Sequence, residues 1–104
     1  MRGDRSISAA RAGYNVDRVA SDRPVFDPAS ATPLFEQAAD YVAGRIAAGE
    51  LAPGQKLPAE RDLADQWGIG YQTVRRAMRE LRERGLVVSR VGKGTFVSAR
   101  PGRP

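Results

Sequence analysis

The residues best suited to bind phosphate lie near the end of the 104-residue chain, where RVGKGTF at residues 90–96 places Lys93 between two glycines. A nucleotide-binding P-loop requires a glycine five positions before its Gly-Lys pair and a serine or threonine directly after it. Those positions hold Val87 and Gly94. A P-loop also needs a helix after the loop, whereas the residues that follow here are typical of a strand. The stretch therefore predicts a basic turn that contacts a larger phosphate polymer, with a plain structural hairpin as the alternative.

One face of a predicted helix at residues 71–84 presents side chains that suit the reading of DNA bases. At 100° per residue, a stripe about 80° wide holds Gln72, Arg75, Arg79 and Arg82. Arginine can donate two hydrogen bonds to the O6 and N7 atoms of guanine, and glutamine can form a two-bonded pair with adenine. Gln72 and Arg75 lie in the N-terminal part of the helix, which a helix-turn-helix protein presses against base edges. Tyr71, Thr73 and Arg76 are better placed for phosphate or sugar contacts.

A solvated helix face is the alternative for the later arginines of this stripe. Such a face is held by ion pairs between residues four apart. The sequence offers three of them: Arg76 with Glu80, Arg79 with Glu83, and Glu80 with Arg84.

The net charge of +5 is unevenly distributed along the chain. Residues 71–104 carry nine basic and two acidic groups, a net charge of +7, whereas residues 33–70 carry −3 and residues 1–32 carry +1. A cationic surface of this kind favours a polyanionic partner, because neutralising phosphates releases their condensed counterions. A basic surface that serves only solubility is the alternative.

The composition excludes most other classes of function. At this length the chain holds one domain at most. It contains no cysteine and no histidine, which excludes disulfides, Cys/His metal sites and mechanisms that need a histidine base or a thiolate. No apolar run approaches the roughly 20 residues of a membrane span, and the N-terminus lacks the pattern of a secretory signal. We therefore expect a soluble, intracellular protein that is not an enzyme and needs no cofactor. DNA binding would place it with the nucleoid in the cytoplasm.

Hydrophobic periodicity predicts three helices. The first begins at Pro33, runs for about 14 residues and ends before Gly49; the second spans residues 59 or 60 to 67; the third spans residues 71–84. Their apolar stripes are, in order, Phe35, Ala38, Ala39, Val42 and Ile46; Leu63, Ala64 and Trp67; Val74, Ala77, Met78 and Leu81.

The remaining segments predict a small sheet and two flexible ends. Residues 86–90 and 95–98 are rich in β-branched and apolar residues and predict a hairpin, and residues 55–57 predict a very short further strand. The fold expected is mainly α with a small β-hairpin: three helices plus a two- to three-stranded antiparallel sheet. Residues 1–32 predict a flexible N-terminal extension, residues 33–98 the folded domain, and residues 99–104 a flexible tail.

Several motifs in order resemble the winged-helix DNA-binding domain of the GntR family of bacterial transcription regulators. They are LPAERDLA at residues 57–64, WGIGYQTVRRAM at residues 67–78, Leu81, Gly85-Leu86 and GKGTFV at residues 92–97. Pro33-Leu-Phe35 with Ile46 and Gly49 resembles the first helix of that domain. The likeness covers about residues 33–98.

The resemblance implies a winged helix-turn-helix that binds double-stranded operator DNA, regulates transcription, most often by repression, and forms a homodimer on a palindromic site. The recognition helix, at about residues 71–84, would lie in the major groove, and the wing, at about residues 90–96, at the backbone and minor groove. Family positions that contact DNA fall on Arg61, Gly70, Tyr71, Gln72, Thr73, Arg75, Gly92 and Lys93. Arg61 is assigned only by this resemblance.

The sequence departs from the family pattern in three places. Gly70 stands where serine or threonine is frequent, and Tyr71 stands where many members have arginine, so that a base contact does not transfer to Tyr71 with the motif. Family members usually continue into an effector-binding or oligomerisation domain, and no effector site is visible here. We expect a short natural regulator in preference to an excised domain. A winged helix that binds protein or RNA is the alternative function.

Overall fold

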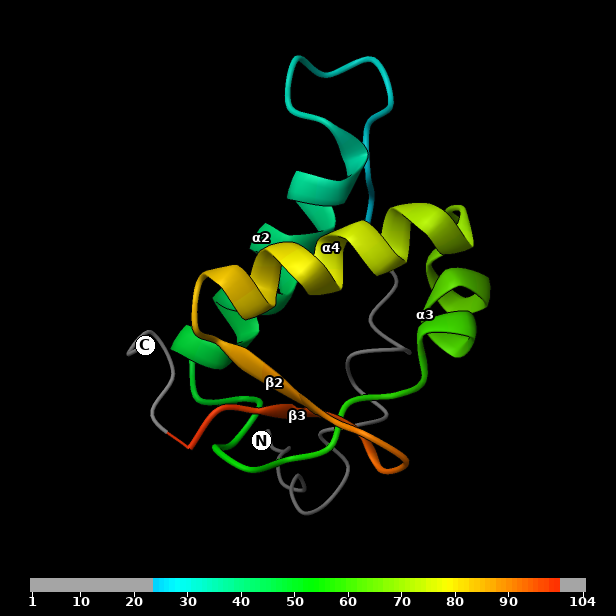
Figure 1. Ribbon diagram of the computed structural model, residues 1–104. Coiled ribbons are helices and arrows are strands. Elements are labelled where there is room, and N and C mark those ends of the chain that lie inside the picture. Colours follow the sequence, from blue (N-terminus) through cyan, green and yellow to red (C-terminus); the bar gives the residue numbers. More distant parts are fainter. Residues whose placement is uncertain (1–23, 100–104) are drawn as a thin grey trace, which may run out of the picture.

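The computed structural model describes residues 24–99, which form three helices and one hairpin. The elements are α2 (Leu34–Ala47), α3 (Glu60–Trp67), α4 (Tyr71–Glu83), β2 (Val87–Arg90) and β3 (Gly94–Val97). Figure 1 shows α4 crossing α2, α3 beside the N-terminal end of α4, and the hairpin below α4. The predicted extension up to residue 23 and the tail from residue 100 lie outside the described residues. No helix in residues 24–99 is long and apolar enough to cross a membrane.

The helices form where their apolar stripes meet in one core. The stripe of α4 is fully buried, with exposed fractions of 0 to 1% for Val74, Ala77, Met78 and Leu81. It packs against α2, α3 and β2, whose buried residues include Val42, Leu63, Trp67 and Val87. The predicted helix spans are thus confirmed to within about a residue. Phe35, predicted as core, is only half-buried, and the guanidinium of Arg76 lies over its ring.

The two strands pair antiparallel, with Val87 opposite Val97 and Arg90 opposite Gly94. The predicted strand at residues 55–57 is reduced to one bridge, between Lys56 and Phe96. Two backbone hydrogen bonds of 2.8 Å flank this bridge: the N–H of Leu57 donates to the carbonyl of Thr95, and the N–H of Val97 donates to that of Gln55. The connector before α3 is therefore held against the hairpin.

The turn of the hairpin depends on glycine at two positions. Gly92 and Gly94 have φ angles of 75° and 123°, which side chains other than glycine rarely adopt. The side chain of Lys56 also crosses the backbone of Gly94, because a Cβ atom there would lie 2.9 Å from Cε of Lys56. The glycine at position 94 thus lets the lysine of the connector reach the turn end of the hairpin.

Residues 24–32 contact the helices, although the sequence pattern predicts a folded domain that begins at Pro33. The ring of Phe26 makes edge-to-face contacts with Tyr41 and Trp67, at centroid distances of 6.2 and 5.8 Å. The side-chain oxygen of Gln37 accepts a hydrogen bond from the backbone N–H of Asp27, and its nitrogen donates to the Asp27 carbonyl. One aromatic residue before Pro33 therefore covers the junction of α2 and α3.

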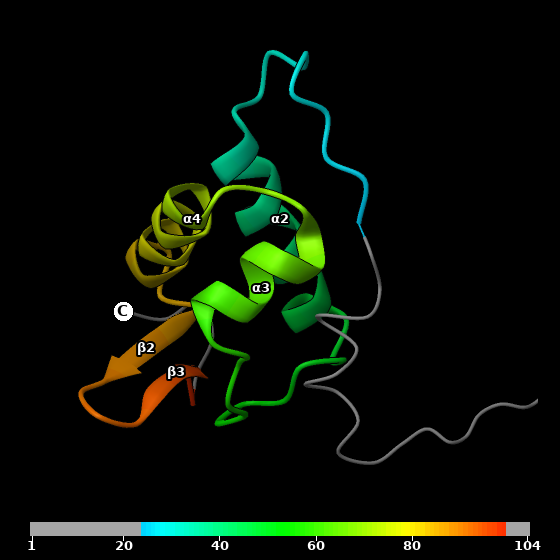
Figure 2. The same ribbon diagram turned by 90° about the vertical axis from the view of Figure 1, so that its right-hand side faces the viewer.

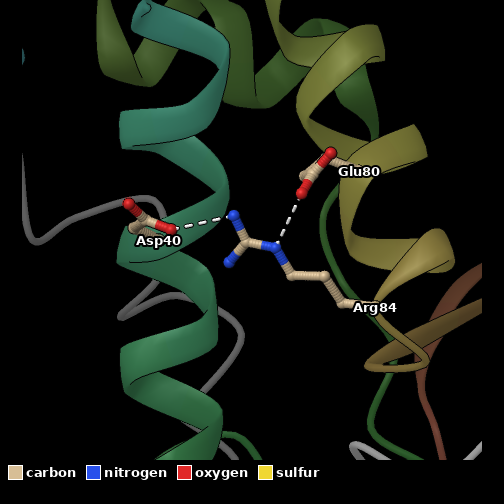
Figure 3. A network of polar contacts seen from close by, with 3 residues as sticks. All are labelled: Asp40, Glu80 and Arg84. Carbon is tan, nitrogen blue, oxygen red and sulfur yellow. Dashed lines mark hydrogen bonds and ion pairs between the residues drawn. The ribbon is translucent and has the colours of Figure 1, made fainter. Parts of the chain in front are cut away.

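An arginine at the end of α4 ties this helix to α2 (Figure 3). Arg84 contacts Glu80 through Nε and Asp40 through a terminal nitrogen, each at 2.9 Å. The hydrogen bond to Glu80 and then the one to Asp40 raise the pKa of Arg84 above its ordinary value, although partial burial opposes the shift. Because its pKa is raised, Arg84 stays charged until the pH exceeds the ordinary pKa of arginine. As the pH rises, the ion pairs of Arg84 are therefore lost only in strong alkali.

Candidate nucleic-acid interface

The face of α4 opposite the core is polar and exposed. Gln72, Arg75, Arg79 and Arg82 are all exposed and line one groove of about 370 Å³, together with Glu60 and Arg76. The apolar stripe holds the other face of α4 against the core, so these side chains must point away from it. The predicted stripe is therefore a continuous basic surface.

The N-terminal ends of α3 and α4 bring Arg61 beside Tyr71. The guanidinium of Arg61 lies over the ring of Tyr71, 4.1 Å from its centroid. The guanidinium of Arg75, one turn further along α4, lies 5.9 Å from the same centroid. Tyr71 is half-buried, whereas both arginines are exposed. Three of the residues predicted to contact DNA thus meet around one ring.

A second groove, of about 920 Å³, separates these helix ends from the hairpin. Figure 2 shows α3 above the β2–β3 hairpin, the two elements whose residues contribute to this lining. Its lining includes four cations and two carboxylates: Lys56, Arg61, Arg90, Lys93, Glu60 and Asp62. The groove is thus positive on balance and lies directly beside the basic face of α4.

The other predicted residues lie around these two grooves. Gly70 is the N-cap of α4 and makes no side-chain cap, as the sequence analysis expects of a glycine there. Thr73 is half-buried and, with Gln72, lines a shallow hollow between the starts of α2 and α4. Gly92 and Lys93 are exposed in the turn of the hairpin and line its groove. All eight residues therefore lie on surfaces next to the first turns of α3 and α4 or on the hairpin.

The predicted ion pairs on α4 form only in part. Arg84 pairs with Glu80. Arg76 instead lies over the ring of Phe35, 4.1 Å from its centroid. Within residues 24–99, no ion pair joins Arg79 to Glu83. The solvated-face alternative thus holds for Arg84, whose ion pairs are structural. Within residues 24–99, Arg75, Arg76 and Arg79 have no carboxylate partner.

One cation of the hairpin groove was missed by the sequence analysis. Lys56 was placed only in a short strand, yet its side chain lies over Gly94 and lines the groove. Its position directly before the LPAERDLA motif was the available signal. That signal could not show how close the connector comes to the turn of the hairpin.

A match to a protein-family model identifies the family of this domain. The model described as "Bacterial regulatory proteins, gntR family" matches residues 34–97, from the first turn of α2 to the end of β3. The chain belongs to the GntR family. The fold, three helices with a two-stranded antiparallel wing, is the winged helix of GntR DNA-binding domains, as the sequence predicts.

Curated GntR relatives match mainly through this domain. An HTH-type transcriptional regulator of Mycobacterium tuberculosis is 44% identical over 72 residues, which are 69% of this chain and 60% of that relative. The mannosyl-D-glycerate transport/metabolism system repressor MngR of Escherichia coli is 45% identical over 65 residues, 62% of this chain and 27% of that protein. The chain therefore spans three fifths or less of the length of these relatives.

Solved GntR structures share the fold. YtrA from Sulfolobus acidocaldarius, a GntR-family transcription factor, superposes with a TM-score of 0.69 at 37% identity, over 73% of this chain and 80% of that one. The DNA-binding domain of AraR in complex with the operator ORX1 gives 0.65 at 34% identity, over 72% and 93%. The family and its relatives are regulators and not enzymes, and the domain described here is of the type that binds double-stranded DNA to regulate transcription.

Proposed function

We propose that this chain binds a specific double-stranded operator through residues 61, 70–73, 75, 92 and 93 and thereby represses transcription. The observation that carries the proposal is the basic face of α4, whose arginines at 75, 76, 79 and 82 form no ion pair within residues 24–99, beside the positive hairpin groove. In this arrangement α4 enters the major groove, and the wing approaches the backbone and the minor groove.

Base reading is assigned to the first turns of α4 and to α3. Gln72 and Arg75 point away from the core near the N-terminal end of α4, where a helix-turn-helix contacts base edges. Arg61 reaches the same region from α3. Gly70 and Thr73 flank these residues, and their small size lets the backbone approach a phosphate.

Backbone contacts are assigned to the wing. Gly92 permits a tight approach to the sugar-phosphate edge, and Lys93 supplies charge at the tip. Lys56 and Arg90 line the same groove and add charge beside it. Such contacts fix the position of the reading helix without selecting a sequence.

Selection of bound sequences from a random pool of duplex DNA tests this function. We expect enrichment of a half-site with positions read by arginine and glutamine. If the chain acts as a homodimer, the half-site should recur as a palindrome with a spacing near one helical turn. A pool that shows no enrichment after repeated rounds would rule out operator-specific binding.

Replacing Arg75 by alanine should weaken operator binding by about 1 to 3 kcal/mol, because a two-bonded arginine–guanine contact discriminates by this amount. Binding to random duplex should change much less. The measurement is fluorescence anisotropy with the selected site and with a scrambled site. Arg79→Ala, which removes a cation available for phosphate contacts further along the same exposed face, is the comparison and should weaken binding to both DNAs alike. Equal losses on both DNAs would assign Arg75 to the backbone.

Replacing Lys93 by alanine should weaken binding to operator and to random duplex to a similar extent. A lysine that neutralises one phosphate releases one condensed counterion, so the slope of log affinity against log salt should become shallower by about one unit. Affinities of the wild type and the variant at four or five salt concentrations give the two slopes. An unchanged slope would remove Lys93 from the backbone contacts.

The partners of the whole protein follow the same proposal. We infer a homodimer on palindromic DNA, located with the nucleoid in the cytoplasm. Since residues 24–99 contain no group of three or more His, Cys, Asp or Glu side chains placed to bind a metal, no metal is assigned. No effector ligand is assigned either.

A further inference from the structure

We propose that Tyr71 is a positioning residue, whose ring holds the guanidinium groups of Arg61 and Arg75 in the orientation that reads DNA. This inference rests on the proposed function of those arginines. The sequence motif gave Tyr71 no such role.

The geometry of the ring supports this role. Tyr71 is the first residue of α4, and Arg61 is the second residue of α3, so the contact joins the two helices of the helix-turn-helix. The ring is half-buried and packs against the core, which fixes its position. Its exposed face carries Arg61 at 4.1 Å, within the range of a cation–π contact. Arg75 lies 5.9 Å from the same ring, near the outer limit of that range.

Stacking leaves the reading edge of an arginine free. A guanidinium contacts an aromatic ring through its flat face, whereas its N–H donors point outward in its own plane. A carboxylate partner would instead occupy those donors. In residues 24–99 no carboxylate forms an ion pair with Arg61. The ring can therefore hold the side chain while the N–H fork stays available for a guanine or a phosphate.

Holding the side chain in advance increases affinity. Ordering a long side chain at an interface costs about 0.5 to 1.5 kcal/mol. A guanidinium already stacked on a ring has lost part of this freedom before binding. The attraction also strengthens when DNA excludes water from the site. Because one ring serves two arginines, removal of the ring should weaken both contacts together.

Three substitutions in the full chain distinguish the effect of the aromatic ring from the effects of the hydroxyl group and of the side-chain volume. Tyr71→Phe keeps the ring, Tyr71→Leu keeps apolar volume without a π system, and Tyr71→Ala removes both. Tyr71→Phe keeps the ring and gives up only a DNA-backbone contact of the hydroxyl, so we expect it to bind the selected operator at most about twofold more weakly than the wild type. Tyr71→Leu and Tyr71→Ala should bind up to about thirtyfold more weakly. Thermal unfolding of each variant shows whether it is folded at the assay temperature.

A second measurement does not depend on DNA or on binding. Ring currents should displace the NMR signals of the Arg61 side chain in the free wild type and in Tyr71→Phe. These signals should return toward the positions of an ordinary exposed arginine in Tyr71→Leu. Unchanged Arg61 signals in folded Tyr71→Leu would overturn the proposal.

Comparison with Arg61→Ala tests the coupling. Adding Tyr71→Leu to Arg61→Ala should cost less than Tyr71→Leu costs alone, because the ring then positions only Arg75. Full additivity would overturn the role of Tyr71 toward Arg61, and a loss in Tyr71→Phe as large as in Tyr71→Ala would assign the effect to the hydroxyl. A wild type that does not distinguish the operator from random DNA would instead refute the proposed function itself.

Discussion

Raising the salt concentration from about 50 to about 200 mM should weaken the binding of this chain to duplex DNA about a thousandfold. The expected number of phosphate contacts is about six, which gives a slope of log affinity against log salt of roughly −5. The cations available for these contacts flank the two grooves and include Lys56, Arg76, Arg79, Arg90 and Lys93. Anisotropy titrations at five salt concentrations measure the slope.

The salt experiment also separates the proposed function from its alternative. Melting temperatures at the same salt concentrations show that the domain stays folded throughout the series. A nearly flat dependence would contradict DNA binding and would favour a winged helix that binds another protein, because such an interface does not release the counterions of a polyphosphate.

Replacing Leu81 by alanine should lower the free energy of unfolding by about 2 to 5 kcal/mol. Leu81 is completely buried where α4 meets the rest of the core, so its truncation removes apolar contacts and leaves a cavity. A small domain has only about 5 to 15 kcal/mol of stability in total. We expect the melting temperature to fall by about 10 °C or more, as measured by circular dichroism.

Arg79→Ala is the matched control for this loss, since residue 79 lies on the exposed side of the same helix. Its stability should stay within about 0.5 kcal/mol of the wild type. Similar melting temperatures for the two variants would show that α4 does not pack through the stripe containing Leu81. Because operator binding requires a folded domain, Leu81→Ala should also lose binding at temperatures above its transition.

Sequence periodicity predicted the first and third helices because their apolar stripes repeat over two or more turns, whereas the stripe of the second helix covers little more than one turn between flanking proline and glycine residues. The two strands were predicted from their β-branched residues on either side of a glycine turn. The strand at residues 55–57 was overestimated, because Pro53 and Pro58 flank it and leave room for only the bridge at Lys56. Local pattern therefore indicated extended backbone there but not the length of the pairing.

The contacts that organise the candidate site could not be predicted in the same way. The motif identified Arg61, but its contact with Tyr71 depends on how closely α3 approaches α4. Arg76 offered a regular ion pair with Glu80, yet lies on Phe35 of another helix. Pairs of this kind join different elements, and the repeat within one helix contains no information about them. The roles of these residues toward DNA remain predictions.

Phe26 stabilises the domain from outside the stretch that the chain shares with its family. The stretch that this chain shares with its family begins at residue 34. The aromatic side chain that covers the junction of α2 and α3 lies eight positions earlier, in sequence that the family model does not include. Substitutions at Phe26 can change the free energy of unfolding without altering the basic face of α4. The stability of the domain therefore depends in part on a side chain outside the stretch that defines the family.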